Sequence, residues 1–245
     1  MKKKIDICLS PELFPFYNSD KKSCVVVVDI FRATTSMCVA FHSGVKSIIP
    51  MADIEKAKEL KEQGFLVGAE RNVARCDFAD FGNSPFDYMD EKIGGREIVM
   101  TTTNGTQAIE VASANDMLII GSFANFSTVL SYLQTINNDV IILCAGWNGR
   151  VNVEDTLFAA ALTESLLGTG EYIAESDAVF VALLMWQDAK NDIRGFLMKS
   201  EHISRLLAHG LQDDIDFCLQ FDTVDSLPFY DKTTARLKLM AGGEE

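Results

Sequence analysis

The sequence predicts a three-layer α/β/α fold, in which helices cover both faces of a largely parallel β-sheet. Short β-branched runs alternate with segments of helical periodicity, and short links join them. Strand–helix–strand units of this kind form right-handed crossovers and build parallel sheets. The run Val25–Val28 is apolar on both faces, as in a strand buried between two layers. We expect a single domain over residues 1–245.

A first strand–helix unit begins at this valine run, and a second begins near residue 95. Asp53 is a suitable N-cap for a charged helix, and Gly64 favours its end. The two units place similar elements in the same order, which suggests two pseudo-symmetric halves at residues 23–68 and 95–143. The predicted strands are 25–28, 45–49, 65–67, 97–100, 117–120 and 140–143, and the predicted helices are 35–41, 53–63, 106–112, 125–134 and 153–167.

Two segments depart from this alternation. Arg71–Gly95 is rich in Asp, Gly, Asn and Pro and has weak periodicity, so we predict a long loop, which is often a functional segment. Residues 180–240 have a mostly helical pattern, with a polar break at Asp213 and Asp214.

Composition excludes several classes of protein. With 35 acidic and 22 basic side chains the net charge is −13, which argues against a nucleic-acid partner, because nucleic-acid binders carry a basic face. The six cysteines are scattered without a C-x-x-C pair, so neither a zinc site nor a disulfide framework is indicated. The apolar run after Lys2–Lys4 is too short for an export signal or a membrane span. We expect a cytoplasmic protein with no membrane partner.

Unusual polar residues follow the valine run, at a strand end where open α/β sheets bind ligands. Asp29 leaves the strand, Arg32 follows three residues later, and Thr34 and Thr35 stand where the next helix begins. They offer a carboxylate, a bidentate phosphate partner and free backbone N–H groups. A threonine cap beside a surface arginine is the ordinary alternative.

Three further strand ends carry comparable groups. One is a threonine-rich turn that could bind an anion at a helix start or be a simple capped turn. Another is a glycine-framed loop that ends in an arginine and an acid pair. The last places a carboxylate beside a guanidinium. In the order described, the turn is Thr101–Thr106, the loop is Gly149-Arg150 with Glu154-Asp155, and the adjacent pair is Glu70-Arg71.

Together these groups suit a Mg²⁺-assisted reaction on a small phosphate ester, because Mg²⁺ prefers oxygen ligands and arginines bind phosphate. The candidate catalytic residues are Asp29, Arg32 and Glu70. The candidate metal ligands are Asp29, Glu70, Glu154 and Asp155. The candidate substrate-binding residues are Arg32, Thr34, Thr35, Arg71, Thr103, Asn104, Gly105, Thr106, Gly149 and Arg150.

A strongly acidic chain can bind an anionic substrate only in a locally positive pocket. We therefore expect Arg32, Arg71 and Arg150 to converge on one site. Another reaction on a phosphate ester, such as an isomerase or transferase reaction, and non-catalytic binding of an anionic metabolite remain alternatives. The histidines His42, His202 and His209 lack metal-ligand spacing, so we interpret them as structural or solvated.

In their order along the chain, these motifs resemble those of the 2-phosphosulfolactate phosphatase (ComB) family. The similarity covers roughly residues 5–230. It implies an α/β fold particular to that family and Mg²⁺-dependent hydrolysis of 2-phosphosulfolactate to 3-sulfolactate and phosphate, a step towards coenzyme M. The matching stretches are Asp29–Thr35, Gly68–Asn72, Phe81–Pro85, Thr101–Thr106, Cys144–Arg150, Glu154-Asp155 and the part from His209 to Pro228.

Two aromatic clusters, Phe14–Tyr17 and Phe78–Phe81, fall in sequence of loop character. Aromatic side chains in loops either seal a pocket or fill a subunit interface, and two-fold dimers are the commonest assembly. We therefore expect a homodimer in which the Arg71–Gly95 loop lies close to the interface and to the site. The alternative is that these aromatics pack onto their own core.

Overall fold

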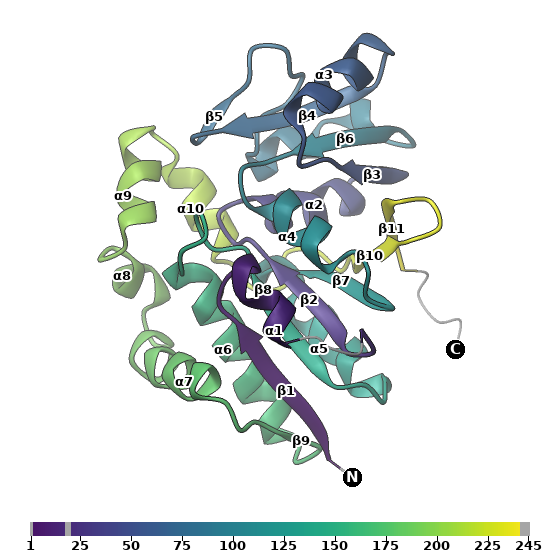
Figure 1. The fold of residues 1–245 in the computed structure, drawn as a ribbon. Coiled ribbons are helices and arrows are strands. Elements are labelled where there is room, and N and C mark those ends of the chain that lie inside the picture. Colours follow the sequence, from purple (N-terminus) through teal and green to yellow (C-terminus); the bar gives the residue numbers. More distant parts are fainter. Residues whose placement is uncertain (1, 18–20, 241–245) are drawn as a thin grey trace.

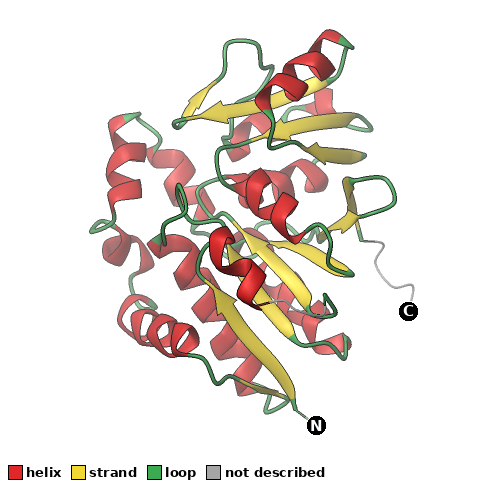
Figure 2. Cartoon of the chain, viewed as in Figure 1, coloured by secondary structure: helices red, strands yellow, loops and turns green. Residues whose placement is uncertain are grey.

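The computed structural model describes residues 2–17 and 21–240, and these residues form one large sheet covered by helices on both faces (Figures 1 and 2). The strands follow the order β5-β4-β6-β3-β11-β10-β7-β2-β8-β1-β9 across the sheet. Their bounds are β1 Lys3–Cys8, β2 Cys24–Val28, β3 Ser47–Pro50, β4 Leu66–Arg71, β5 Ala74–Arg75, β6 Glu97–Thr101, β7 Met117–Gly121, β8 Val140–Cys144, β9 Tyr172–Ile173, β10 Pro228–Asp231 and β11 Arg236–Leu239.

The helices follow the strands in alternation as far as α6, and α7 to α10 then form a continuous helical segment. Their bounds are α1 Phe14–Tyr17, α2 Ala33–His42, α3 Ile54–Glu62, α4 Gly105–Ala112, α5 Phe126–Thr135, α6 Val153–Gly168, α7 Asp177–Ala189, α8 Ile193–Leu197, α9 Glu201–Ala208 and α10 Gln212–Cys218. Short 3-10 helices are η1 Pro11–Leu13, η2 Pro85–Met89, η3 Glu91–Ile93 and η4 Phe123–Asn125.

The buried strand β2 shows how the three layers form. Val26 and Val28 belong to the hydrophobic cluster that contains buried residues of α5 and α6, whereas Val25 and Val27 belong to the cluster with residues of α2 and α4. All four side chains are fully buried. Because successive side chains of a strand point to opposite faces, the valine run supplies both cores at once. The predicted α/β/α fold is confirmed.

The two predicted halves interleave in the sheet. Strand β2 pairs in parallel with β7 and β8, and β6 pairs in parallel with β3 and β4. The first strand of each half therefore lies between two strands of the other half. The internal repeat over 23–68 and 95–143 stays a prediction, but the two halves share one sheet.

The helical pattern predicted up to residue 240 is wrong for its last part. After α10 the chain forms the hairpin of β10 and β11, which inserts between β7 and β3 through Phe229 opposite Ile119 and Leu237 opposite Ile48. The hairpin pairs with strands that would otherwise be sheet edges, so their backbone groups are satisfied. Because its partner strands are distant in the chain, no local sequence pattern predicts this pairing.

The Arg71–Gly95 segment is more ordered than the predicted loop. It contains β5, which is antiparallel to β4, and the short helices η2 and η3. Of the aromatic clusters, Phe14 and Phe81 are buried in the chain's own core, whereas Phe16 is 85% exposed. The Asp53 cap of α3 is confirmed, since its side chain accepts from the N–H groups of Glu55 and Lys56. Within the described ranges, no helix has the length and apolarity to cross a bilayer.

Candidate active site

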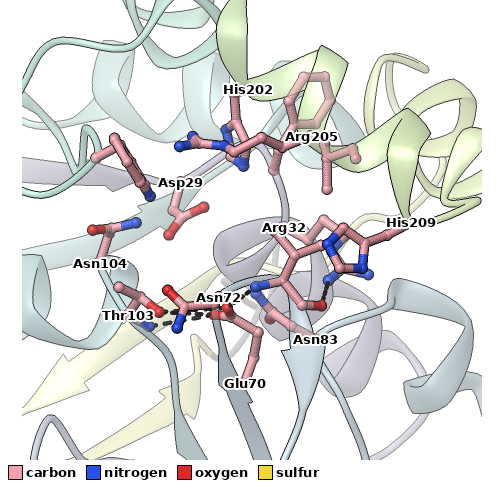
Figure 3. A pocket seen from close by; sticks show the side chains of 14 residues that line it. Asp29, Arg32, Glu70, Asn72, Asn83, Thr103, Asn104, His202, Arg205 and His209 are labelled. Carbon is pink, nitrogen blue, oxygen red and sulfur yellow. Dashed lines mark hydrogen bonds between the residues drawn. The ribbon is translucent and has the colours of Figure 1, made fainter.

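A cavity of about 240 Å³ opens at the carboxyl ends of β2, β4 and β6. This volume is below the roughly 300–1,000 Å³ of drug-sized pockets, so it suits a small metabolite. Helix α9 closes the side opposite the strand ends (Figure 3). The lining residues are Asp29, Phe31, Arg32, Glu70, Asn72, Val73, Asn83, Thr103, Asn104, Trp147, His202, Arg205, Leu206 and His209.

Asp29 is held on the cavity wall by the turn between β2 and α2. Its N–H donates to Thr34 Oγ1 at 3.0 Å, and the Thr34 hydroxyl donates to the Asp29 carbonyl at 3.0 Å. Thr35 similarly donates to the carbonyl of Ile30. Both threonines are fully buried and absent from the cavity wall, so we correct their assignment: they position Asp29 rather than bind substrate.

The environment of Asp29 opposes its ionisation. The side chain is 6% exposed, and burial raises its pKa to about 6. The charges of Glu70 and Glu154 contribute to this rise in pKa, while His202 and the Ala33 N–H oppose it. A carboxyl that titrates near neutral pH inside a cavity is typical of a functional site.

Gly105 provides the space that Asp29 occupies. A Cβ at this position would lie 2.6 Å from Ala33 Cβ and 2.8 Å from Asp29 Oδ2. The residue itself is not on the cavity wall, so we correct its assignment from substrate binding to spacing. Thr106, also predicted to bind substrate, is buried and exchanges hydrogen bonds with Thr102 at the start of α4.

Gly105→Ala is therefore expected to displace Asp29 or the start of α4. A displacement of about 1 Å at a reacting group can reduce the rate about 10²-fold, and we expect a loss of this order in kcat/KM. The matched control is Gly168→Ala at the end of α6, where an added Cβ meets nothing within 4 Å. Steady-state kinetics and circular dichroism of both variants check this, and full activity of Gly105→Ala would contradict it.

Glu70, at the end of β4, is tied to both neighbouring segments. Its Oε1 accepts from Val73 N–H at 2.6 Å, and Thr103 on the cavity wall donates to both oxygens at 3.3–3.4 Å. Val73 has a φ of 75°, which is rare for a β-branched residue. In this conformation its carbonyl accepts from Arg32 Nη2 at 3.0 Å. In this strained backbone conformation, Val73 connects two candidate catalytic residues: its N–H donates to Glu70 and its carbonyl accepts from Arg32.

Arg32 lies on the cavity wall with its charge already compensated. Its Nη1 forms an ion pair with Asp214 of α10, and the two side chains are 5% and 7% exposed. Asp214 also accepts from Ser84 Oγ at 2.9 Å. This pair connects the β2–α2 turn to the C-terminal helical segment and to the 71–95 segment, both of which contribute to the cavity.

Of the three arginines predicted to converge, Arg32 lines the cavity, whereas Arg71 and Arg150 do not. Arg71 donates to the carbonyls of Glu70 and Ala52 and to Thr101 Oγ1. Arg150 is exposed, and its backbone pairs with that of Trp147. Neighbouring positions in a motif do not determine where long side chains point.

Of the two remaining predicted binding residues, one lines the cavity and the other does not. Asn104 lines the cavity, and its Oδ1 accepts from Asn148 N–H at 3.1 Å. Gly149 lies outside it, has a φ of 73°, and leaves room for Glu12, whose Oε1 a Cβ would approach to 2.8 Å. Gly149 therefore serves the turn that follows β8.

The acid pair at the start of α6 lies behind the cavity. Asp155 is fully buried and accepts from Ile30 N–H at 2.9 Å and Gly146 N–H at 3.1 Å. Burial raises its pKa well above the ordinary value, and the charge of Asp29 adds to this effect. Glu154 is also fully buried, and its Oε1 contacts His202 Nδ1. Neither lines the cavity, so we withdraw both as metal ligands.

The cavity itself fits a Mg²⁺ ion held by few protein ligands. Among the described residues no three His, Cys, Asp or Glu side chains form a group that could hold a metal, so the expected three-carboxylate cluster is not formed. Asp29 and Glu70 remain on the wall, and Glu70 raises the pKa of Asp29. A divalent cation would relieve this repulsion, and Mg²⁺ commonly uses only one or two carboxylates.

Sequence reasoning missed the wall supplied by α9. His202 and His209, interpreted as structural or solvated, line the cavity together with Arg205. These residues are three and four positions apart, which places them on one face of a helix, while Ile203 and Leu206 are buried. That spacing was the available signal. His42 lies elsewhere, beside Asp225.

The fold and the cavity define an α/β protein with a small, polar binding site at the carboxyl ends of its strands. The family model of 2-phosphosulpholactate phosphatase matches residues 8–233, and the chain belongs to this family of phosphoric monoester hydrolases. It is 38% identical to a probable 2-phosphosulfolactate phosphatase of Thermotoga maritima, over 83% of this chain and 87% of the relative. Relatives with the same name are 35% identical in Caldanaerobacter subterraneus subsp. tengcongensis (85% and 88% covered) and 31% identical in Clostridium beijerinckii (93% and 96%).

Proposed function

We propose that this protein is a Mg²⁺-dependent phosphatase that hydrolyses 2-phosphosulfolactate, or a similar phospho-2-hydroxy acid, to 3-sulfolactate and phosphate. The observation that carries the proposal is the composition of the cavity wall. A buried carboxyl with a pKa of about 6, Asp29, shares a small cavity with the guanidinium groups of Arg32 and Arg205. The names of the relatives agree with this substrate.

The charges on the cavity wall suit a substrate with several negative groups. His202 and Arg205 lie across the cavity from Glu70, and Arg32 and His209 also line it. Phosphate and sulfonate groups accept several hydrogen bonds each, and guanidinium groups donate them in a fixed planar arrangement. The chain as a whole repels anions, so this local positive charge is required for binding.

Asp29 and Glu70 are the residues that would hold the metal. A bound Mg²⁺ would polarise the phosphoryl oxygens and neutralise charge that develops on them. Hydrolysis transfers the phosphoryl group to water, breaks the ester P–O bond and returns a proton to the departing alcohol oxygen. Arg32 would stabilise the phosphoryl oxygens, and His202, held by Glu154, would donate that proton.

The phosphatase proposal predicts metal-dependent release of inorganic phosphate. Purified protein would be offered 2-phosphosulfolactate, 2-phospholactate and 2-phosphoglycolate, with Mg²⁺, with EDTA, and with Mg²⁺ restored after EDTA. We expect phosphate release with Mg²⁺, its loss with EDTA and its recovery on restoration, with 2-phosphosulfolactate the preferred substrate. A colorimetric phosphate assay measures all arms.

Other outcomes would identify the alternatives. A product formed without free phosphate would indicate an isomerase or a transferase. Thermal stabilisation by the phosphate esters without turnover would indicate a binding protein. Phosphate release that is unchanged by EDTA would contradict the metal requirement alone.

Assembly, location and pathway are further proposals. A homodimer remains our prediction, and the exposed Phe16 is a candidate interface residue. Asn72, Val73 and Asn83 bring the 71–95 segment to the cavity wall, as expected for a segment that limits access of water. A cytoplasmic location and a place in coenzyme M synthesis also stay predictions.

A further inference from the structure

We infer that Arg205, stacked on Trp147, binds the terminal sulfonate of the substrate and thereby determines substrate selection. The inference rests on the proposed phosphatase function, because it assigns one group of that substrate to one wall of the cavity. Neither residue was singled out as a binding residue by the strand-end motifs.

Arg205 lies over an aromatic ring, with much of its hydrogen-bonding capacity unused. Its guanidinium carbon is 3.7 Å from the centre of the Trp147 ring. Its Nε is buried without a hydrogen-bond partner. Its Nη1 lies 3.5 Å from Glu201, but that carboxylate is 76% exposed, so solvent weakens the pair. The N–H groups of a guanidinium lie in its own plane, so a guanidinium stacked on a ring can still direct them at an oxyanion beside the ring.

The other arginine on the cavity wall is differently placed. Arg32 forms a buried ion pair with Asp214 and also donates to the Val73 carbonyl. Its charge is therefore largely compensated by the protein itself. Of the two arginines that line the cavity, Arg32 has a buried carboxylate partner, whereas the carboxylate beside Arg205 is exposed.

The position of Arg205 favours the substrate's terminal group over its phosphate. Asp29, Glu70 and Thr103 come from the strand ends, which is where the phosphoryl group and metal are proposed to lie. Arg205 comes from α9, on another wall of the same cavity (Figure 3). In 2-phosphosulfolactate the carboxylate is attached to the phosphate-bearing carbon, whereas the sulfonate is one carbon further away. The sulfonate is thus the group that reaches furthest from the reacting centre.

The turn after β8 supports this arrangement. Trp147 and Arg150 exchange backbone hydrogen bonds at 2.8 and 2.9 Å, which closes a tight turn. Gly146 has a φ of 60°, and a Cβ there would lie 2.3 Å from the Arg150 carbonyl oxygen. The turn fixes the backbone of Trp147, so its ring offers a defined platform for the guanidinium. The Arg150 motif that sequence analysis assigned to binding thus contributes through its backbone.

The test compares two substrates that differ only in the sulfonate. For Arg205→Met, kcat/KM for 2-phosphosulfolactate should fall about 10- to 100-fold, the range of a hydrogen bond to a charged group. The fall should come mainly through KM, because the sulfonate does not react. For 2-phospholactate, which lacks the sulfonate, the change should stay below about 3-fold on the same reasoning. Arg205→Lys and Trp147→Leu should give intermediate, equally selective losses.

A control and a second measurement separate binding from folding and from catalysis. Arg96→Met makes the same charge change at an exposed position before β6, at the opposite end of the strands. It should leave kcat/KM unchanged for both substrates. Binding of 3-sulfolactate, measured by calorimetry, should weaken about 10- to 100-fold in Arg205→Met. This arm needs no turnover, so it tests Arg205 even if phosphate release fails.

Two results would overturn the inference. Equal losses for 2-phosphosulfolactate and 2-phospholactate would show that Arg205 acts on the reacting centre or on folding. Absent or unchanged 3-sulfolactate binding would show that the sulfonate lies elsewhere. Failure of the wild-type protein to release phosphate from any substrate would instead contradict the proposed function.

Discussion

Asp29→Asn is expected to remove nearly all activity while it stabilises the fold at neutral pH. The substitution keeps the size of the side chain but removes the charge proposed to hold the metal or to act on the phosphoryl group. Loss of a single group that stabilises charge in a transition state lowers kcat about 10²- to 10³-fold, and we expect at least this effect. Phosphate release at saturating Mg²⁺ measures it.

The stability gain follows from the raised pKa of Asp29. Its pKa in the folded protein is about 6, above its ordinary value of 3.8, mainly because the carboxyl is buried. Between these two pH values the folded chain binds the proton more strongly than the unfolded chain, so wild-type stability should rise as pH falls from about 7 to about 4. Asp29→Asn lacks this penalty. Its melting temperature should exceed that of the wild type by several degrees at pH 7, since 1 kcal/mol corresponds to about 2–4 °C.

The difference between the two proteins should shrink as the pH falls below 6. Asp188→Asn, at an exposed position of α7, is the matched control and should leave both activity and melting temperature unchanged. Near-normal turnover by Asp29→Asn would contradict the catalytic assignment. An unchanged melting temperature at pH 7 would contradict the burial penalty alone.

Arg32→Met is expected to destabilise the protein strongly. The substitution leaves Asp214 buried with no opposite charge, and breaking a buried ion pair in this way costs about 3–5 kcal/mol. The melting temperature should fall by on the order of 10 °C. Differential scanning calorimetry of the variant measures this change.

An ion pair between α8 and α10 supplies a control. Arg194 contacts Asp216, but these side chains are 43% and 44% exposed, so Arg194→Met should cost less than about 1 kcal/mol. The double variant Arg32→Met/Asp214→Asn removes the unpaired charge and keeps an acceptor for Ser84, so it should recover most of the lost stability. Its activity should stay at least about 10²-fold low if Arg32 acts on the phosphoryl group. Activity that returns together with stability would make Arg32 purely structural.

Local rules were sufficient wherever the physical cause was local. Alternating runs predicted the layered sheet, because a strand buried on both faces must be apolar throughout. The Asp53 cap was correct because capping involves only neighbouring N–H groups. The rule that ligands bind at strand ends found Asp29, Glu70 and Thr103, all of which line the cavity.

Contacts between distant segments decided the rest. The C-terminal hairpin pairs with β7 and β3, which precede it by more than 100 residues, and no local pattern indicates such a partner. For the same reason, Asp155 proved to join two loops by accepting from Ile30 and Gly146. The sequence alone does not distinguish a carboxylate that faces the cavity from one that faces the core.

The sequence by itself determined which strand ends carry chemistry, because the direction of parallel strands brings their carboxyl ends to one edge. Only the tertiary structure decided which cations face that edge. Arg71 and Arg150 lie next to the predicted motifs yet are turned to other partners or to solvent, whereas Arg205 reaches the cavity from α9. The orientation of a long side chain depends on packing between elements, and that packing is set by the whole fold rather than by neighbours in the chain.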